Sequence, residues 1–391
     1  MELKTIEEIA FINPDSIKKD YPYDEIEYID IQSVGSGYLI ESKLMPLSEA
    51  PSRAKRLIKD GDTILSTVRP NRRSFLYIKK PKENVVVSTG FAVLRAKEDI
   101  DSRYLYYAIT DQKFTDYLTL SAKGAAYPAV DTEIIQRGKI PVYPMDVQQK
   151  ISSILSAYDD LIENNTRRIQ ILEKMAQLIY REWFVNFRFP GHKKVRFIDS
   201  ELGKIPEGWE VKKLAEFAVI KGGKRLSADK IFSQGRYPVF GGNGIQGYCS
   251  ESMYEGFVIA FGRVGAYCGS IHWSYNGAWL NNNASSVIPY HSPELLLGHL
   301  LNFNFDNLRG GAAQPFISNS SLANIKLLFP PAQMRNNFCE IVKPLRLQVE
   351  KLKEKNNILR QTRDLLLPKL ISGELDVSDL DIVVKDINEE K

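Results

Sequence analysis

The sequence has 391 residues, which is typical of two or three domains, and its 43% hydrophobic and 26% charged residues are ordinary for a globular protein. It contains no run of roughly 18 apolar residues, and its charged N-terminus lacks the apolar core of a signal peptide, so we expect a cytoplasmic protein. Three widely spaced cysteines argue against a disulfide scaffold and a structural zinc site, and the net charge of +4 includes no polybasic arm.

A globular α/β segment is predicted first, over residues 1–145. Short apolar runs such as TILSTV and NVVVSTGFAVL are bounded by Gly, Pro, Asn and Asp, which is typical of strands joined by turns. The pattern SRYLYYAITDQKFTDYL, residues 102–118, predicts helical patches beside these strands.

A long helix is predicted next, over residues 146–187, followed by a linker over 188–204. Apolar side chains recur in the helix at alternating steps of three and four, the pattern of a coiled-coil seam. Asn165 places in that seam a polar residue of the kind that can fix the register of two helices. The residues expected to pack in this helix are Ile151, Ile154, Leu161, Asn165, Leu172 and Ile179.

A second globular segment over 205–332 and a second long helix over 333–375 repeat this organisation. The runs GFVIAFGRVGAYC and NASSVIPY predict strands, and the helix shows the same three–four spacing. The residues expected to pack in this helix are Phe338, Ile341, Leu352, Asn356, Leu359 and Leu366. Residues 376–391 are expected to form a C-terminal tail.

The chain contains an internal repeat. GAAYPAV at 124–130 matches GAAQPFI at 311–317, and KIPVYP at 139–144 matches KLLFPP at 326–331 with the same spacing. The match continues without insertion through both long helices. The predicted fold class is therefore α/β (α+β): two similar domains, each with a mixed twisted sheet and short helices, separated by an antiparallel coiled coil and related by a pseudo-twofold axis. Periodicity alone would also allow a helical hairpin within a larger bundle.

Several strings resemble a known family. YREWFVNFRFPGH (180–192), running into GKIPEGWEVKKL (203–214), resembles the junction between the first central helix and the second recognition domain in specificity subunits of type I restriction-modification systems. LLLPKLISGELDV (365–377) resembles the family's ending after its second helix. YPVFGGNGIQGYC, GFVIAFGRVGAYCG and LNNNA, between residues 237 and 284, look like a common target-recognition domain of that family. The resemblance covers nearly the whole chain and is weakest over 1–120.

The resemblance implies a DNA-binding subunit without chemistry of its own. Two target-recognition domains would read the unequal halves of a split double-stranded DNA target. The helical spacer would set the gap and recruit two methyltransferase subunits, with restriction subunits joining for cleavage. No cofactor is expected on this chain, because S-adenosylmethionine would be held by the partner methyltransferase. Half-sites about one helical turn (~34 Å) apart face the same side of the duplex, which suits a reader with two heads.

Basic and amide side chains in both globular segments are candidate DNA contacts. Arg, Asn and Gln can bond bidentately to guanine or adenine edges, and Gly222 and Gly223 would let the backbone approach a phosphate. Each of these residues could equally be a solvated charge or a turn residue. The candidates are Arg53, Lys55, Arg56, Arg69, Asn71, Arg72, Arg73, Lys221, Lys224, Arg225, Asn243, Gln246, Arg263, Asn281, Asn282 and Asn283.

Enzyme motifs are weak in this sequence. GNGIQG at 242–247 satisfies G-x-G-x-x-G, but a turn and a strand follow it instead of the helix that would bind a pyrophosphate. Pro14-Asp15 with Glu41-Ser42-Lys43 loosely fits a metal-dependent nuclease pattern, which many chains match. A self-sufficient nuclease or methyltransferase, and a coiled-coil scaffold without DNA affinity, remain the alternatives to a non-catalytic DNA reader.

Overall fold

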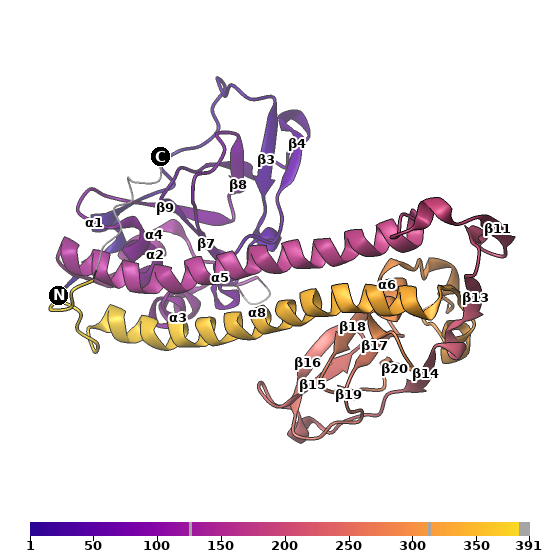
Figure 1. Cartoon of the computed structure of the whole chain (residues 1–391). Helices are drawn as coiled ribbons and strands as arrows, with labels where there is room; N and C mark the ends of the chain where they lie inside the picture. The colour runs from indigo at the N-terminus through magenta and orange to yellow at the C-terminus, as the bar shows by residue number, and fades with distance from the viewer. Residues whose placement is uncertain (125–126, 312–313, 383–391) are drawn as a thin grey trace. The chain divides into compact units, whose positions relative to one another are not determined.

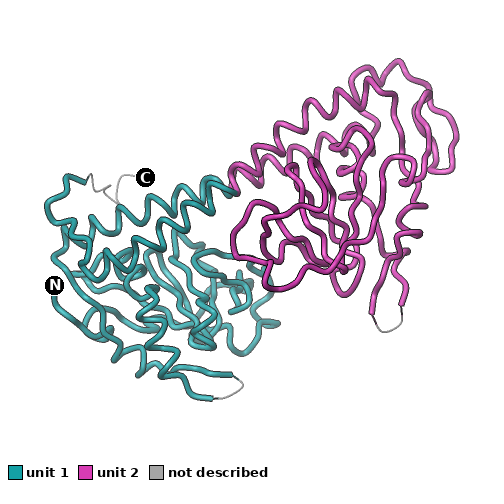
Figure 2. The backbone as a smooth tube through the Cα atoms, turned by 90° about the horizontal axis from the view of Figure 1, so that it is seen from below, with its two compact units in different colours: residues 1–166, 354–391 teal, residues 167–353 magenta. Residues whose placement is uncertain are grey.

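The computed structural model describes residues 1–124, 127–311 and 314–382, and it divides into two compact units (Figure 2). One unit comprises Met1–Thr166 with Glu354–Lys391, and the other comprises Arg167–Lys353. The two long helices, α5 (Met145–Tyr180) and α8 (Ala332–Ser372), are labelled in Figure 1, and each contributes to both units (Figure 2). Each unit therefore combines a globular part with a stretch of both helices.

The first unit contains two four-stranded sheets. The first sheet is antiparallel, with strand order β2 (Ala10–Ile12), β9 (Phe91–Ala96), β6 (Thr63–Ser66), β7 (Phe75–Tyr77). The second has the order β4 (Lys43–Pro46), β3 (Glu25–Ile29), β8 (Val85–Ser88), β5 (Ala54–Leu57), and its central pair β3–β8 is parallel. A strand pair, β1 (Glu2–Thr5) with β10 (Lys139–Val142), and the helices α1 (Ile6–Ile9), α2 (Ser102–Thr110), α3 (Gln112–Ser121) and α4 (Thr132–Arg137) complete this part.

Strand β9 shows why the first unit needs both layers. Successive side chains of a strand point to opposite faces of the sheet. Ala92 and Leu94 pack with α2 and the long helices, whereas Phe91 and Val93 pack with β3 and β8. All four side chains are fully buried, so this strand is covered by helices on one face and by the second sheet on the other.

The second unit repeats this strand order. Its antiparallel sheet runs β14 (Ala218–Gly222), β20 (Ala284–Pro289), β17 (Val258–Gly262), β18 (Ile271–Ser274). Its second sheet runs β16 (Gly244–Cys249), β15 (Tyr237–Gly241), β19 (Trp279–Leu280), again with a parallel pair, β15–β19. The remaining elements are β11 (Phe197–Ser200) paired with β12 (Gly203–Pro206), β13 (Glu210–Lys213) paired with β21 (Lys326–Phe329), α6 (Pro293–Asn302) and α7 (Asn319–Ala323).

The predicted mixed sheet is thus divided in two in each unit. One sheet is purely antiparallel, and a separate sheet carries the parallel pair. The sequence could not separate them, because a strand that is buried on both faces has a continuous apolar pattern whichever sheet it joins.

The long helices contact each other in antiparallel register within each unit. In the first unit the side-chain amide of Asn165 donates to the side-chain oxygen Oδ1 of Asn356 over 2.9 Å, and Arg363 forms an ion pair with Asp159. In the second unit Ile169 packs with Val349 and Leu352, and with Leu172 beside them.

Two of the residues expected to pack between the helices are exposed in this structure. Leu161 and Ile341 are 52% and 44% exposed, whereas Leu155, earlier on α5, and Val342, next to Ile341, are fully buried. A straight helix has 3.6 residues per turn, so a stripe with strict three–four alternation drifts away from the buried face. The other predicted residues are buried or half-buried: Ile151, Ile154, Asn165, Leu172, Ile179, Phe338, Leu352, Asn356, Leu359 and Leu366.

Both helices end in aromatic or apolar contacts. Helix α5 passes into a π-helical turn, Arg181–Val185, that buries the adjacent side chains Trp183 and Phe184 against Phe338. After α8, Val377 is only 1% exposed and joins the core of the first unit, so the predicted tail is partly packed. Residues 383–391 of that tail lie outside the described part of the chain.

The histidine of α6 gives this packing a pH dependence. His299 is 5% exposed, its Nδ1 lies 2.8 Å from the hydroxyl of Tyr180, and burial lowers its pKa to about 4. In the unfolded chain this histidine binds its proton near pH 6.5. Its contribution to the free energy of unfolding is therefore fully present above pH 6.5 and is lost as the pH falls toward 4. We expect a loss of about 3 kcal/mol from this group over that range.

This prediction is checked by urea unfolding at pH 7 and pH 4.5 of the wild type and of His299→Gln. The variant should show the smaller decrease in the free energy of unfolding between pH 7 and pH 4.5, since the other groups that titrate in acid are common to both proteins. Equal decreases would mean that His299 does not set the pH dependence.

Candidate nucleic-acid interface

Four segments of the second unit converge around the turn between β15 and β16. The carbonyl oxygen of Gly242 in this turn accepts a hydrogen bond from the Ser270 hydroxyl over 2.7 Å. The backbone N–H of Arg263, just after β17, donates to Asn283 just before β20 over 3.1 Å. The N–H of Lys224 donates to Leu280 over 2.9 Å. The structure therefore brings the predicted residues of this unit into one region.

Gly223 makes this convergence possible. A Cβ at this position would lie 2.0 Å from the carbonyl oxygen of Asn281 and 2.5 Å from that of Leu280. Only a glycine permits such a close approach of two backbone segments. The predicted role of this glycine in approaching a phosphate is thus joined by a structural one, since it positions the exposed side chains of Lys224 and Arg225.

The side chains of this region fall into two groups. The Asn281 amide donates to Gln246, and its oxygen accepts from the N–H of Asn283 over 2.9 Å. Arg263 is half-buried over the Phe316 ring, 5.1 Å from its centroid. The other predicted residues, which are exposed at the surface, are Lys221, Lys224, Arg225, Asn243 and Asn282.

In the first unit the main basic group lies on the turn after β6. Arg69 and Arg73 have left-handed backbone conformations, with φ of 50° and 55°, on either side of a short 3-10 turn, Pro70–Arg72. This turn leaves Asn71 and Arg72 exposed. Arg69 lies over the ring of Tyr127, 4.5 Å from its centroid.

Arg73 is bound within the protein. Its guanidinium donates to the carbonyl oxygen of Thr110 over 2.9 Å and to the side chain of Gln112. It therefore links the turn to the start of α3, whereas Arg72 next to it faces solvent.

The second basic group of this unit lies at the start of β5. Arg53 forms an ion pair with Asp30 over 2.9 Å, Lys55 is exposed, and Arg56 is half-buried with a pKa lowered by burial. The turn between β8 and β9 connects the two groups, since Thr89 donates to the Arg53 carbonyl and Gly90 accepts from Thr67.

Sequence reasoning missed a hairpin at residues 34–39 that lies against the arginine turn. The Ser36 hydroxyl donates to the Arg73 carbonyl over 2.7 Å, and the N–H of Gly37 donates to Phe75 over 2.9 Å. Tyr38 and Ile40 are 57% and 58% exposed beside it. The string Gly-Ser-Gly at 35–37 was the available signal of a tight turn.

The same backbone arrangement occurs in both units. Lys123 and Ala129 bridge a hairpin that also pairs with Val68, and Gly310 and Phe316 bridge a hairpin that also pairs with Val264. The N–H of Val130 donates to Thr67, and the N–H of Ile317 donates to Arg263. We call each turn with its hairpin a platform: residues 67–73 with 123–130 in the first unit, and 263–270 with 310–317 in the second. Residues 125–126 and 312–313 within the hairpins lie outside the described residues.

The weak enzyme motifs have other structural roles. GNGIQG forms the β15–β16 hairpin, with Gly241 paired to Gly244. Asp15 is bound to Arg95 over 2.7 Å, and this hydrogen bond lowers the pKa of its carboxyl group. Across the described ranges, no group of three or more His, Cys, Asp or Glu side chains could hold a metal ion. No helix in the described part of the chain is both long and apolar enough to cross a membrane.

The chain belongs to the family of type I restriction-modification DNA specificity proteins. The family model of the type I restriction modification DNA specificity domain matches residues 1–174 and again residues 206–360. The protein is therefore a specificity subunit, the non-catalytic part of a type I restriction-modification enzyme that selects the DNA sequence.

Curated relatives match over nearly their whole length. The MjaIX specificity subunit of Methanocaldococcus jannaschii is 26% identical, covering 97% of this chain and 94% of the relative. The HindI specificity subunit of Haemophilus influenzae is 23% identical, covering 90% and 95%. A crystal structure of the type I S subunit from M. genitalium shares the fold, with a TM-score of 0.61 and 18% identity over 95% of this chain and 96% of that one.

The close approach at Gly223 can be tested by substitution. We expect Gly223→Ala to destabilise the protein by about 1–3 kcal/mol, because the added methyl group overlaps a backbone carbonyl that cannot move aside. Gly222→Ala is the matched control, since its Cβ would lie 3.5 Å from a flexible arginine terminus. Urea unfolding of both variants checks this, and equal effects would contradict it.

Proposed function

We propose that each platform reads one half of an asymmetric, split DNA target. The observation that carries this proposal is the repetition of one backbone arrangement with different side chains. Where the first unit has Thr67 and Tyr127, the second has Arg263 and Gln314 at the corresponding positions. Because base edges are read by side chains, two platforms of one shape and different chemistry suit two different half-sites.

The exposed residues divide by chemistry into positioning and reading groups. Lysines such as Lys55, Lys221 and Lys224 suit phosphate contacts, which orient a protein on DNA without reading its sequence. Arg72, Arg225, Asn71, Asn243 and Asn282 have the planar groups that can recognise a base edge. Tyr38 and Ile40, exposed beside the arginine turn, add apolar groups that can contact a thymine methyl.

We assign residues 1–145 and 205–332 to target-recognition domains and residues 146–187 and 333–375 to spacer helices, with a linker at 188–204 and a tail at 376–391. In this proposal the helices form an antiparallel coiled coil that relates the halves by an approximate twofold axis and sets the gap in the target. The antiparallel contacts found within each unit, above all the Asn165–Asn356 pair, support this arrangement.

The outer surface of the spacer helices suits the recruitment of partners. Apolar side chains that neither unit buries lie along both helices, at Leu161, Ile171, Met175, Leu178, Ile358 and Leu365. Exposed apolar surface of this kind marks protein interaction sites. We propose that it binds two methyltransferase subunits, which restriction subunits join for cleavage.

Substitutions of exposed residues in one unit should affect one half of the target. We expect Arg225→Ala or Asn243→Ala to relax base preference in one half-site and Arg72→Ala in the other, each with about tenfold weaker binding. The measurement is a long-read methylome of a methylation-free host that expresses the chain with its candidate methyltransferase subunit.

The same experiment separates the alternatives. A split motif with a fixed gap, methylated only when both proteins are present, would establish the specificity role. Equal effects of every variant on both half-sites would contradict the division of labour. Metal-dependent nicking by the purified chain would favour a self-sufficient nuclease, and a complex that forms without DNA affinity would favour a scaffold.

Adjacent residues of α5 should separate spacer packing from partner binding. Leu172 packs with Val349 and Leu352, whereas Ile171 is 50% exposed. We expect Leu172→Asp to cost roughly 2–4 kcal/mol of stability, because it places a charge in an apolar contact. Ile171→Asp should leave stability unchanged and reduce co-purification of the methyltransferase subunit. Thermal unfolding and pull-down of both variants measure this, and loss of partner binding without loss of stability in Leu172→Asp would contradict the assignment.

A further inference from the structure

Each unit contains a polar cluster where its globular part meets the long helices. In the first unit the hydroxyl of Tyr107, on α2, donates to Asp159 on α5 over 2.6 Å, and Arg363 on α8 forms an ion pair with the same carboxylate. We call these three residues the first seat. In the second unit the hydroxyl of Tyr275 donates to Glu294 on α6 over 2.5 Å, and the Glu294 carboxylate lies 3.1 Å from Nε of Arg346 on α8.

The residues that the long helices contribute to the two clusters occupy equivalent positions of the internal repeat. The alignment that pairs Ile151 with Phe338 also pairs Asp159 with Arg346, and it pairs Ala176 with Arg363. We call Tyr275, Glu294, Arg346 and Ala176 the second seat. The spacer position that faces the globular part is therefore acidic in the first unit and basic in the second.

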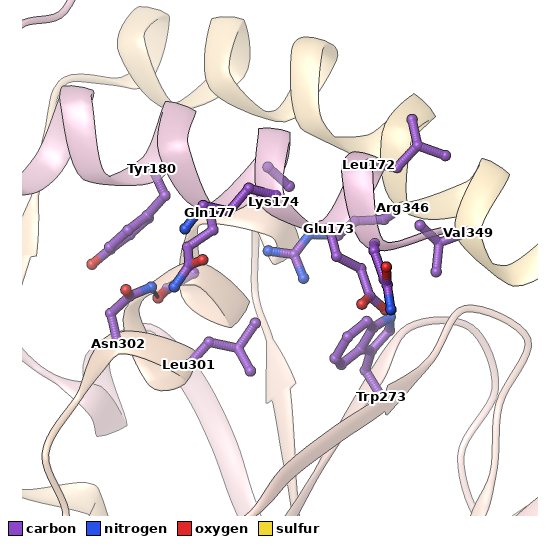
Figure 3. A pocket seen from close by; sticks show the side chains of 13 residues that line it. Leu172, Glu173, Lys174, Gln177, Tyr180, Trp273, Leu301, Asn302, Arg346 and Val349 are labelled. Atoms are coloured by element: carbon purple, nitrogen blue, oxygen red, sulfur yellow. Dashed lines mark hydrogen bonds between the residues drawn. The ribbon is translucent and has the colours of Figure 1, made fainter. Parts of the chain in front are cut away.

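The element that supplies the opposite charge to Asp159 in the first unit differs from the element that supplies it to Arg346 in the second. In the first seat the other long helix supplies the base that pairs with Asp159, Arg363, and the globular part contributes the neutral hydroxyl of Tyr107 to the same carboxylate. In the second seat the equivalent position of the other long helix, α5, holds Ala176, whose side chain is uncharged and too short to reach Arg346. Ala176 lines a cavity of about 460 Å³ together with Arg346 and Trp273, and Figure 3 shows Arg346 and Trp273 in this cavity. The acid that forms the ion pair with Arg346 therefore comes from the globular part, as Glu294, and the charge of Glu173 on α5 acts on Arg346 more weakly.

Burial makes this complementarity costly to break. The side chain of Glu294 is fully buried and that of Arg346 is 8% exposed, with the Trp273 ring centroid 5.4 Å from the guanidinium carbon. Burial raises the pKa of Glu294, and the hydrogen bond from Tyr275 and the charge of Arg346 oppose that shift. Removing one member of a buried pair leaves an uncompensated charge, which is far more destabilising than losing an exposed ion pair.

We propose that the charges of the two seats make each globular part compatible with only its own end of the spacer. We call the charged residues that produce this matching the key of each seat. A domain that presents Glu294 would meet the carboxylate of Asp159 in the first seat. A domain that presents Tyr107 would leave Arg346 without its ion-pair partner in the second seat. Fit to a seat is a property of the folded chain alone, and only its consequence, a fixed order of the two half-site readers, rests on the proposed function.

Exchanging the globular parts tests this proposal. In the exchanged chain residues 205–331 precede α5 and residues 1–144 precede α8. Four substitutions exchange the keys: Asp159→Arg, Arg363→Ala, Ala176→Arg and Arg346→Asp. In the native order they should lower the midpoint of thermal unfolding by on the order of 10 °C, because both seats become mismatched. In the exchanged order the same four substitutions should raise the midpoint or recover soluble protein.

The reversal of sign between the two orders is the result that a merely structural role would not produce. An exchanged chain as stable as the native one without the substitutions would overturn the proposal. So would an exchanged chain that the four substitutions leave no more soluble or stable. Methylation of DNA by the partner is recorded separately, so loss of DNA reading with keyed stability intact would count against the proposed function and not against the keys.

A smaller set of variants in the native order tests the second key alone. Arg346→Asp should lower the midpoint sharply, and adding Glu294→Arg should recover at least half of that loss by restoring opposite charges. Lys353→Asp, at the half-exposed ion pair with Glu173, is the matched control and should shift the midpoint by no more than about 2 °C. A double variant no more stable than Arg346→Asp would contradict the key.

Discussion

The burial of each globular part against the long helices is the constraint on which the structure depends. A sheet with two apolar faces must be covered on both, and in the first unit α5 and α8 provide part of that cover through Ile151, Leu155 and Leu370. In the second unit Trp183, Phe184 and Phe338 join the helices to α6 through Leu295. The helices are thus part of each unit's core, which makes the attachment of each globular part to the long helices stiff.

This attachment explains how a protein without catalytic chemistry can define a DNA target. The platforms are turns and hairpins, elements that tolerate side-chain change because their backbone hydrogen bonds do not depend on it. The shared bonds from Val130 to Thr67 and from Ile317 to Arg263 hold the same shape while the exposed side chains differ. In the proposed function, recognition can therefore diverge at the platform while the buried seats and the helix contacts keep the geometry of the subunit.

Polar groups inside the apolar contacts give the helices their specificity. The Asn165–Asn356 pair satisfies its hydrogen bonds only in one register, and a shift would bury unpaired amides. The Asp159–Arg363 ion pair also joins the two helices, and in the second unit the Arg346–Glu294 ion pair joins α8 to α6. Apolar contacts alone, such as Ile169 with Val349, would tolerate sliding because they are not directional.

The sequence by itself determined the duplication, the two long helices, the polar seam residues and the family, because these depend on local periodicity and on strings of neighbouring residues. It also placed the basic turn at Arg69–Arg73 and the glycine pair at 222–223. Only the tertiary structure decided that Leu161 and Ile341 are exposed, that Arg73 is bound internally while Arg72 faces solvent, and that Tyr38 and Tyr127 lie beside the arginine turn. These outcomes depend on contacts between residues far apart in the chain, such as Arg73 with Thr110, and no local pattern encodes them.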